Sequence, residues 1–283
     1  MSESAVDVRT PATPRAQPGE ALRFDRVTCS FRSNSGAGLY TAVRDASLSV
    51  DTGEFVSVVG PTGCGKSTLL NVAAGLLRPT SGTITAFGSS FAGLNRDAAY
   101  LFQGESLMPW GRAIDNIAVG LRFHGKSRAE ALEIAQDWLD RVGLHSHGAL
   151  FPHQMSGGMR KRVAIAQALA LNPPIILMDE PFSALDIQTR QMMETELLDL
   201  WSQDRKSVLF ITHDLEEAIS LSDRVVVLSA GPGTHPIAEF TIDLPRPREV
   251  ADIRLSPDFL RLHTAIWGVL KEEVLKGYAQ GKR

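Results

Sequence analysis

The sequence contains little cysteine and no apolar run long enough to cross a membrane. Cys29 and Cys64 are too few for a disulfide framework, and they lack the paired spacing of a metal site. The closest approach to a membrane span, residues 163–178, is broken by Pro173 and Pro174 and falls short of the roughly 20 residues required. The amino terminus also lacks a basic-then-apolar export signal. We therefore expect a protein of a reducing compartment that reaches a membrane only through a partner.

Charge of one sign is not in excess either. The 29 Lys and Arg residues nearly balance the 32 Asp and Glu residues, which leaves a net charge of −3. This balance argues against a generally basic surface, and we expect no nucleic-acid partner. Hydrophobic residues make up 43% and charged residues 22%, ordinary values that exclude wholesale disorder. A length of 283 residues suits one large domain, with or without an appendage.

The amino-acid composition of the chain changes after residue 20. Residues 1–20 contain three prolines and almost no large apolar side chain, so we expect a disordered tail. Alternating apolar residues then predict short strands at 22–27 and 46–50. Between these strands, residues 33–38 are rich in Ser, Gly and Asn and predict a loop.

The later part of the chain alternates between strand and helix patterns. Strands are predicted at 55–59, 175–178, 208–211 and 225–228, and helices at 67–77, 187–203 and 215–221. This rhythm indicates an α/β fold with a parallel-rich sheet and helical cover.

Two further helices carry clear start signals. Ser127 and Glu130 have capping-box spacing, and the helix that they open is expected to end near Gly143. Ser256 as N-cap and Pro257 at the first helical position open a last amphipathic helix. We expect its apolar residues to pack on the domain, with contact to a partner protein as the alternative. These residues are Phe259, Leu260, Leu262, Ile266, Val269, Leu270 and Val274.

A glycine-rich segment joins the strand at 55–59 to the helix that follows it. It consists of Gly60, Pro61, Thr62, Gly63, Cys64, Gly65, Lys66, Ser67 and Thr68, a full match to the phosphate-binding loop. The glycines let backbone amides approach phosphate oxygens, and the helix N-terminus adds a favourable dipole. We expect Lys66 to reach the β- and γ-phosphates and the Ser67 hydroxyl to bind Mg²⁺. At Cys64 the backbone amide is expected to matter and the thiol is not.

The strand at 175–178 ends in two carboxylates, Asp179 and Glu180. A buried strand that delivers an acid to its carboxyl end is how such folds present a Mg²⁺ ligand, and Asp179 suits this role. Glu180 is then placed to orient or deprotonate the attacking water. Beside a phosphate loop, this pair indicates hydrolysis of a nucleotide.

A second helix start lies between these motifs, at Ser156, Gly157 and Gly158. Ser156 is a natural N-cap, and the two glycines expose backbone amides. The helix continues through residues 163–171. It is therefore a second position where an anion can bind a helix N-terminus.

In their order and spacing, these motifs resemble the nucleotide-binding subunit of an ATP-binding-cassette (ABC) transporter. The resemblance rests on residues 60–68, Gln103, Ser156 to Gly158, Asp179, Glu180, residues 183–186 and His213. It implies ATP and Mg²⁺ as cofactors. It also implies a P-loop core with an antiparallel β subdomain and a helical signature subdomain at about residues 100–172. The ATPase domain would span residues 21–245, followed by a helical extension at 246–283.

The resemblance also assigns roles outside the phosphate loop. Gln103 matches the glutamine that senses Mg²⁺ and relays to the permease, and His213 matches the histidine that contacts the γ-phosphate. In this family the serine-glycine signature of one subunit closes on the ATP held by the other. Ser156, Gly157 and Gly158 would therefore act across a head-to-tail dimer, with Asp186 at its interface. The second subunit is an identical copy or a paralogue.

Two positions need separate comment. Phe31 stands where the family has the aromatic that stacks on adenine, but Tyr40 is a second candidate and a core role for Phe31 stays open. Met159 stands where the commonest signature has glutamine. Because Ser156 and backbone amides do most of the anion binding, we expect activity to survive this change.

Two segments, residues 107–110 and 243–248, are similar to those of the nitrate, sulfonate and taurine importers. Trp110 in the first segment would lie near the permease or be half buried in the core. This branch implies a transmembrane permease, an indirectly associated periplasmic or extracellular solute-binding protein, and a peripheral location at the cytoplasmic face of the inner membrane. The alternatives are the ATPase of an exporter or lipid transporter and a soluble non-transport ABC ATPase.

Overall fold

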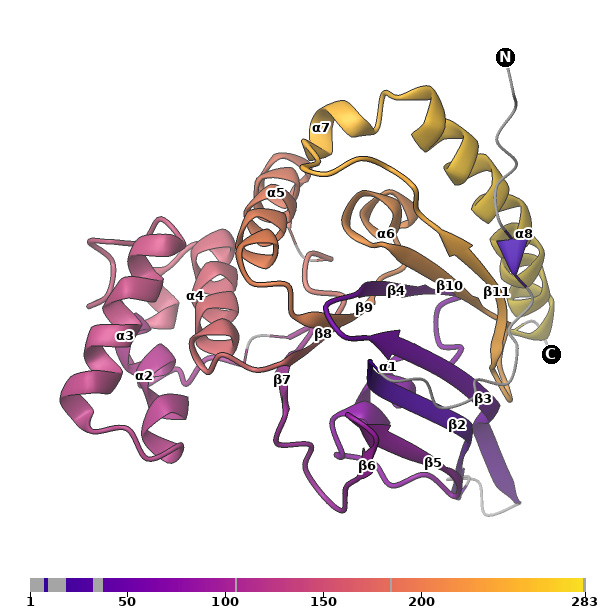
Figure 1. Ribbon diagram of the computed structural model, residues 1–283, viewed down its shortest axis with the longest axis horizontal. Coiled ribbons are helices and arrows are strands. Elements are labelled where there is room, and N and C mark those ends of the chain that lie inside the picture. Colours follow the sequence, from indigo (N-terminus) through magenta and orange to yellow (C-terminus); the bar gives the residue numbers. More distant parts are fainter. Residues whose placement is uncertain (1–7, 10–18, 33–37, 105, 184, 282–283) are drawn as a thin grey trace.

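Two sheets, a helical lobe and a long carboxy-terminal helix make up the chain (Figure 1). The computed structural model describes residues 8–9, 19–32, 38–104, 106–183 and 185–281. The strands are β1 (Val8–Arg9), β2 (Glu20–Arg32), β3 (Leu39–Asp51), β4 (Phe55–Val59), β5 (Ser81–Ala86), β6 (Ser89–Ser90), β7 (Ala98–Leu101), β8 (Ile175–Asp179), β9 (Ser207–Ile211), β10 (Arg224–Leu228) and β11 (Pro236–Thr241). The helices are α1 (Lys66–Ala73), α2 (Ala113–Phe123), α3 (Arg128–Arg141), the 3-10 helix η1 (Pro152–Gln154), α4 (Gly157–Ala170), α5 (Ile187–Gln203), α6 (Leu215–Leu221), α7 (Val250–Ile253) and α8 (Pro257–Gly281).

The main sheet has seven strands in the order β1-β11-β10-β4-β9-β8-β7, and the five strands from β10 to β7 are parallel. Its central strands β4, β8 and β9 are buried along their whole length, and their mostly apolar sequences are typical of a sheet covered on both faces. Val58 of β4 and Asp179 of β8 both pair with Ile211 of β9. The segments that follow these three strands therefore leave the sheet at one level of the same edge.

The second sheet is antiparallel, in the order β3-β2-β5-β6. Its buried face packs with α1 and the main sheet around one core, which includes Leu22, Phe24 and Leu48. The expected α/β fold class, with a parallel-rich sheet and an antiparallel part, is confirmed. The strands predicted at 22–27 and 46–50 are the inner parts of β2 and β3, which are longer because they pair with each other along most of their length.

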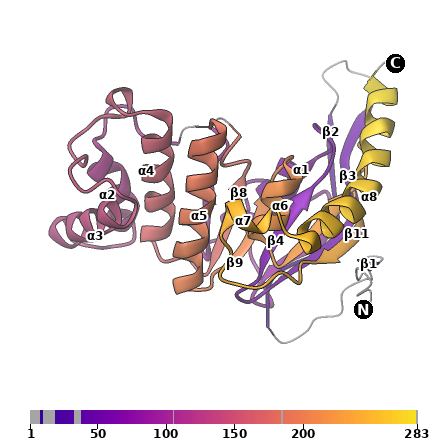
Figure 2. The same cartoon turned by 90° about the horizontal axis from the view of Figure 1, so that it is seen from above.

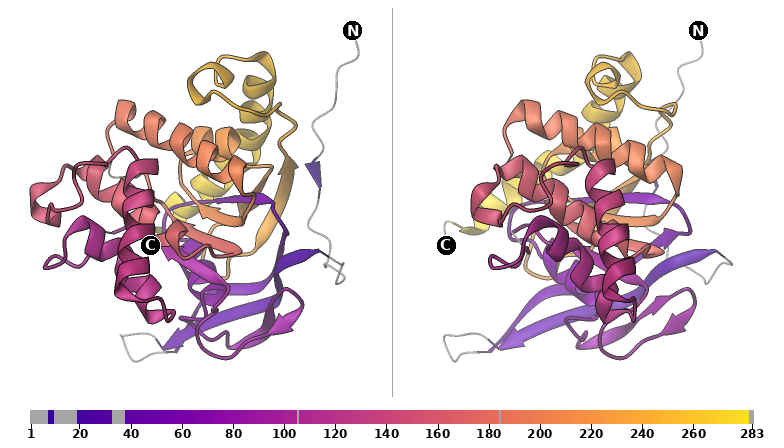
Figure 3. Two further views of the ribbon diagram at one scale, coloured as in Figure 1. Left: turned by 60° about the vertical axis from the view of Figure 1, so that its left-hand side comes forward. Right: turned by 90° about the vertical axis from the view of Figure 1, so that its left-hand side faces the viewer.

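Helices α2, α3 and α4 form a lobe at the end of the molecule opposite α8 (Figure 2), and Figure 3 shows this lobe in front of the sheets. The capping box that opens α3 is present, because Ser127 Oγ accepts from the Glu130 amide at 3.2 Å and Glu130 Oε2 accepts from the Ser127 amide at 2.9 Å. A continuous core joins the lobe to the main sheet through buried residues of α4 and α5.

The carboxy-terminal helix α8 packs along the β10 and β11 side of the main sheet. It starts as expected, with Ser256 Oγ accepting from the Phe259 amide at 3.2 Å. Most of its predicted packing residues are buried or partly buried, which confirms packing on the domain. Leu260 is the exception, since it is 57% exposed on the outer side of the helix.

Three further expectations need correction or lie outside the described residues. The tail prediction is wrong at Val8–Arg9, because β1 pairs with the otherwise open edge of β11, which offers unpaired backbone groups. Residues 1–7, 10–18 and 33–37 of the predicted tail and loop lie outside the described residues. The helix expected at 67–77 ends at Ala73, close to Gly75, whose φ of 71° is left-handed.

Candidate functional site

The phosphate loop joins β4 to α1 with a backbone that requires glycine. Gly65 has a φ of 123°, and a Cβ at this position would lie 3.0 Å from Thr234 Cγ2 and 3.2 Å from the Ala42 carbonyl oxygen. Lys66 is 6% exposed, and its Nζ donates to the carbonyl oxygens of Gly60 at 2.9 Å and Pro61 at 3.0 Å. The ammonium is thus held against its own loop, where it can exchange these acceptors for phosphate oxygens.

Asp179 lies at the end of β8, directly beside the first turn of α1. Ser67 Oγ donates to Asp179 Oδ1 at 3.1 Å, and the Tyr100 hydroxyl donates to Oδ2 at 3.4 Å. Burial raises the pKa of Asp179, while the hydrogen bond from Ser67 acts in the opposite direction. A hydroxyl and a carboxylate are oxygen donors of the kind that Mg²⁺ prefers, so this pair fits the metal. Within the described residues no cluster of three Asp, Glu, His or Cys side chains is positioned to hold a metal. Phosphate oxygens and water would therefore supply the other ligands.

Glu180 meets both other residues predicted to be catalytic. Gln103 Nε2 donates to Glu180 Oε2 at 3.3 Å, and His213 Nδ1 lies 2.9 Å from the same oxygen. The backbone of Glu180 is in the left-handed region, with a φ of 43°, which costs energy for a residue with a Cβ. Its amide donates to the Ile211 carbonyl at 2.8 Å and Ser183 Oγ donates to its carbonyl at 3.0 Å, so the strained position is fixed from two sides.

The serine-glycine segment opens α4 in the lobe. Ser156 Oγ accepts from the Met159 amide at 3.2 Å, which confirms the N-cap. Apart from the chain neighbours of Gly157 and the backbone of its own helix, no atom of the described residues lies within 4 Å of a Cβ built on Gly157, so this helix end is open to an approaching group. Met159 is partly buried and packs against the apolar core.

The segment before α5 is placed by a side-chain cap. Asp186 Oδ1 accepts from the Thr189 amide at 3.0 Å, and hydrogen bonds from Thr189 lower the pKa of Asp186. Ala184 of the matching family motif lies outside the described residues.

The two aromatic candidates for adenine stacking lie side by side. Phe31 of β2 pairs directly with Tyr40 of β3, and the side chains are 38% and 46% exposed. This exposure excludes the core role considered for Phe31. Ala42, two residues beyond Tyr40, contacts Gly65, so this strand end adjoins the phosphate loop. Both aromatics remain candidates.

Helix α8 reaches the phosphate loop, a contact that the sequence did not reveal. A cavity of about 520 Å³ is lined on one side by the loop and His213 and on the other by Trp267, Leu270, Val274, Gly277 and Tyr278 of α8. Glu273 anchors the helix, because its Oε2 accepts from the Ala230 amide at 2.7 Å. A Cβ built on Gly277 would lie 3.6 Å from Pro61 Cβ, so α8 passes within van der Waals distance of the loop at this position.

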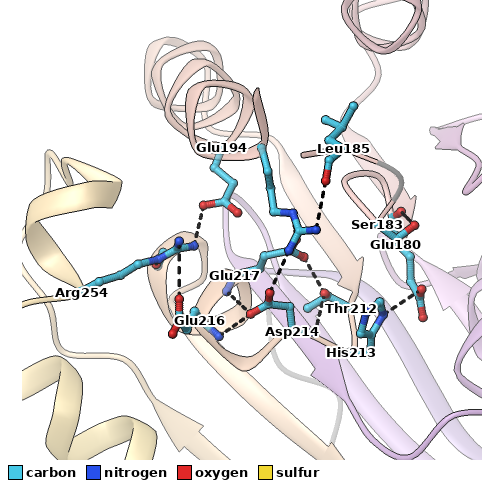
Figure 4. Close-up of polar contacts among 12 residues, drawn as sticks. Glu180, Ser183, Leu185, Glu194, Thr212, His213, Asp214, Glu216, Glu217 and Arg254 are labelled. Atoms are coloured by element: carbon cyan, nitrogen blue, oxygen red, sulfur yellow. Dashed lines mark hydrogen bonds and ion pairs between the residues drawn. The ribbon is translucent and has the colours of Figure 1, made fainter. Parts of the chain in front are cut away.

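Sequence reasoning also missed Tyr100 and a set of charges behind His213. Tyr100 belongs to no motif and meets Asp179 only through the pairing of β7 with β8. The charges are shown in Figure 4, where Arg254 contacts Glu194 and Glu216. Glu194 is fully buried, and its Oε2 lies 2.7 Å from Arg254 Nη2, while its Oε1 finds no hydrogen-bond partner among the described residues. Burial raises the pKa of Glu194 to about 8.

The phosphate loop, the acidic strand end and the parallel sheet define a P-loop nucleotide hydrolase. Residues 43–183 match the ABC transporter family. The nitrate import ATP-binding protein NrtD of Synechocystis is 44% identical over 239 residues, 83% of this chain and 90% of that protein. The taurine import ATP-binding protein TauB of Rhizobium johnstonii is 41% identical over 253 residues, 88% and 96% of the two chains. This chain belongs to the ABC transporter family, as an ATP-binding ATPase subunit.

A solved structure supports the same assignment. It is a dimeric ATP-binding cassette in a post-hydrolysis state, bound to ADP and phosphate. The TM-score is 0.70 at 32% sequence identity, and the match covers 79% of this chain and 100% of the cassette chain.

The raised pKa of Glu194 predicts a pH-dependent stability. Its pKa is about 8 in the folded state against the ordinary value of 4.5, so the folded protein binds the extra proton between these pH values. The free energy of unfolding should therefore fall, relative to that of Glu194→Gln, as the pH rises from 4.5 to about 8. Denaturant unfolding of both proteins at several pH values measures this difference in the free energy of unfolding. A difference that does not change with pH would contradict the raised pKa of Glu194.

Proposed function

We propose that this chain powers an importer by hydrolysing ATP at the edge of its main sheet. The observation that carries the proposal is the meeting of Gln103, Glu180 and His213 at one carboxylate oxygen. They lie beside a phosphate loop whose Ser67 is bonded to Asp179. Each of the three groups suits a different part of water attack on a phosphoryl group.

The residues divide the work as follows. Backbone amides of residues 60–68 and the Lys66 ammonium hold the phosphates. Ser67 and Asp179 would hold Mg²⁺, with Gln103 as a further candidate ligand, and the metal when bound would offset negative charge on the phosphate oxygens. Glu180 accepts the proton of the attacking water, and His213, bonded to the same carboxylate, contacts the γ-phosphate.

The second half of each site comes from another ATPase subunit. Gly157 and the α4 N-terminus are open, and the cavity at the phosphate loop is lined by that loop, His213 and α8 among the described residues. An open helix start fits the ATP of a second subunit arranged head to tail, with Asp186 at the interface. The solved cassette cited above is dimeric, which supports this arrangement.

The transporter also contains a transmembrane permease. No described helix has the length and apolar character of a membrane span. Trp110 is 77% exposed, which excludes the core role considered for it and suits contact with a permease. We place the subunit peripherally at the cytoplasmic face of the inner membrane, with a solute-binding protein on the other side. The names of the relatives suggest nitrate or taurine as the solute, and the resemblance at residues 107–110 and 243–248 adds other sulfonates.

Glu180→Gln tests the hydrolytic assignment. The amide cannot accept the proton of water, so we expect ATP to bind with near wild-type affinity while turnover falls by a factor of about 10² or more. Nucleotide affinity by calorimetry and phosphate release in the assembled transporter measure the two effects. Turnover above about a tenth of wild type, less than the usual loss of a general base, would reject Glu180 as the base.

Complementation tests the shared site. Gly157→Asp places a carboxylate against the γ-phosphate of the other subunit, where like charges repel, and Lys66→Ala disables the phosphate loop. Each variant alone should be inactive. A mixture should regain part of the activity, because each heterodimer has one site that combines the intact phosphate loop of the Gly157→Asp subunit with the intact signature of the Lys66→Ala subunit.

Crosslinking decides the case if the mixture stays inactive because two working sites are needed. Cysteines at Thr62 and Ser156 should crosslink different chains when ATP is added to the Glu180→Gln background. The native Cys29 and Cys64 are both buried, which limits background reaction. Absence of any crosslink between chains would reject the head-to-tail dimer.

The solute can be tested on the purified transporter with its permease and solute-binding protein. We expect ATPase activity to be stimulated by nitrate, a sulfonate or taurine, because solute binding must favour the closed ATPase dimer. Stimulation by none of these, together with transport outward from loaded vesicles, would reject the importer assignment and leave the ATPase assignment standing.

A further inference from the structure

Arg190, in the first part of α5, bridges the loop that ends at Asp186, proposed to face the second subunit, and the loop that contains His213, proposed to contact the γ-phosphate. Its Nη2 donates to the Leu185 carbonyl oxygen at 3.2 Å, and its Nη1 donates to Asp214 Oδ2 at 3.2 Å. Leu185 directly precedes Asp186, and Asp214 directly follows His213. One rigid, planar guanidinium therefore sets the separation between the loop before α5 and the loop before α6.

The partners of Arg190 are themselves fixed. Asp214 uses its other oxygen, Oδ1, to cap α6 by accepting from the amides of Glu216 at 2.8 Å and Glu217 at 3.3 Å (Figure 4). The Glu217 carboxylate is 2% exposed, accepts from the Thr212 hydroxyl at 2.5 Å and lies 3.7 Å from Arg190 Nε. Because the cap and the bridge use different oxygens, the link to Arg190 can be removed while α6 keeps its start.

We propose that Arg190 is a positioning residue that sets His213 according to the position of the Asp186 loop. His213 Nδ1 lies 2.9 Å from Glu180 Oε2, so a shift of the loop before α6 moves the histidine relative to the reacting groups. Asp186 belongs to the loop proposed to face the second subunit, and the inference rests on that proposed function. Arrival of the second subunit at Asp186 would then be transmitted through Leu185, Arg190 and Asp214 to the histidine.

Arg190→Met and Arg190→Lys test the bridge in the assembled transporter. Arg190→Met retains the apolar stem and removes both hydrogen bonds. We expect kcat to fall about tenfold to a hundredfold, because small displacements of reacting groups cost this much, with the KM for ATP near wild type. Arg190→Lys retains a cation beside Asp214 and Glu217, but one ammonium cannot span both loops. We expect the melting temperature of Arg190→Lys to equal that of wild type, while its kcat stays as low as that of Arg190→Met.

Arg254→Met is the matched control. Arg254 is another partly buried arginine of the same charge cluster, bonded to Glu194 at 2.7 Å, but it contacts neither loop. Its removal should leave kcat near wild type. Asp214→Asn keeps an oxygen for the α6 cap, and combining it with Arg190→Met should lower kcat no further than either single change, because both break the same link.

The inference is overturned if Arg190→Lys restores kcat, if Arg254→Met lowers kcat as much as Arg190→Met does, or if the losses of Arg190→Met and Asp214→Asn multiply. Should Arg190→Met fail to fold, Arg190→Lys and Asp214→Asn still decide, since each keeps a polar group in place. An inactive wild type, or a fully active Glu180→Gln variant, would contradict the proposed function instead. An active wild type with an unchanged Arg190→Met variant contradicts the bridge alone.

Discussion

The parallel registration of β4, β9 and β8 is the constraint on which the whole site depends. Val58 and Asp179 both pair with Ile211, so the phosphate loop, the acidic pair and the His213 loop all leave the sheet at one level. A slip of one residue in β8 would turn Asp179 to the opposite face and away from Ser67. These mostly apolar strands resist such a slip, because they are buried along their whole length between layers that pack on both faces of the sheet.

Ionisable side chains are buried behind this edge, and they fix the positions of the helices more than they add to the stability of the fold. Removing Glu194 and Glu217 from water is costly, and the arginines that accompany them offset this cost without a large net gain in stability. What the cluster does supply is fixed distances between α5, α6 and α7. The backbone of Glu180 shows a related use of constraint, since its left-handed conformation is held by Ile211 and Ser183.

The phosphate loop is also supported from outside the segment that matches the family. Helix α8 is distant in sequence from residues 43–183, yet its Gly277 lies next to Pro61 of the phosphate loop. The apolar side of α8, with Phe259 and Ile266 fully buried, holds it on the main sheet, and Glu273 fixes its distance from the loop through Ala230. The exposed Trp267 and Tyr278 thereby come to line the cavity beside the loop.

The sequence by itself determined the features whose causes lie within a few residues. The glycine turns of residues 60–68, the caps at Ser127, Ser156 and Ser256, and the acids at the end of β8 are of this kind, because each depends on local backbone geometry and on an unbroken apolar run. Only the tertiary structure decided the rest. Tyr100 meets Asp179 across a strand pair, and α8, packed on β10, meets the phosphate loop that follows the neighbouring strand β4. Neither contact produces a periodic pattern in the sequence. Each joins residues that are distant in the chain and that come together only when the sheet has formed.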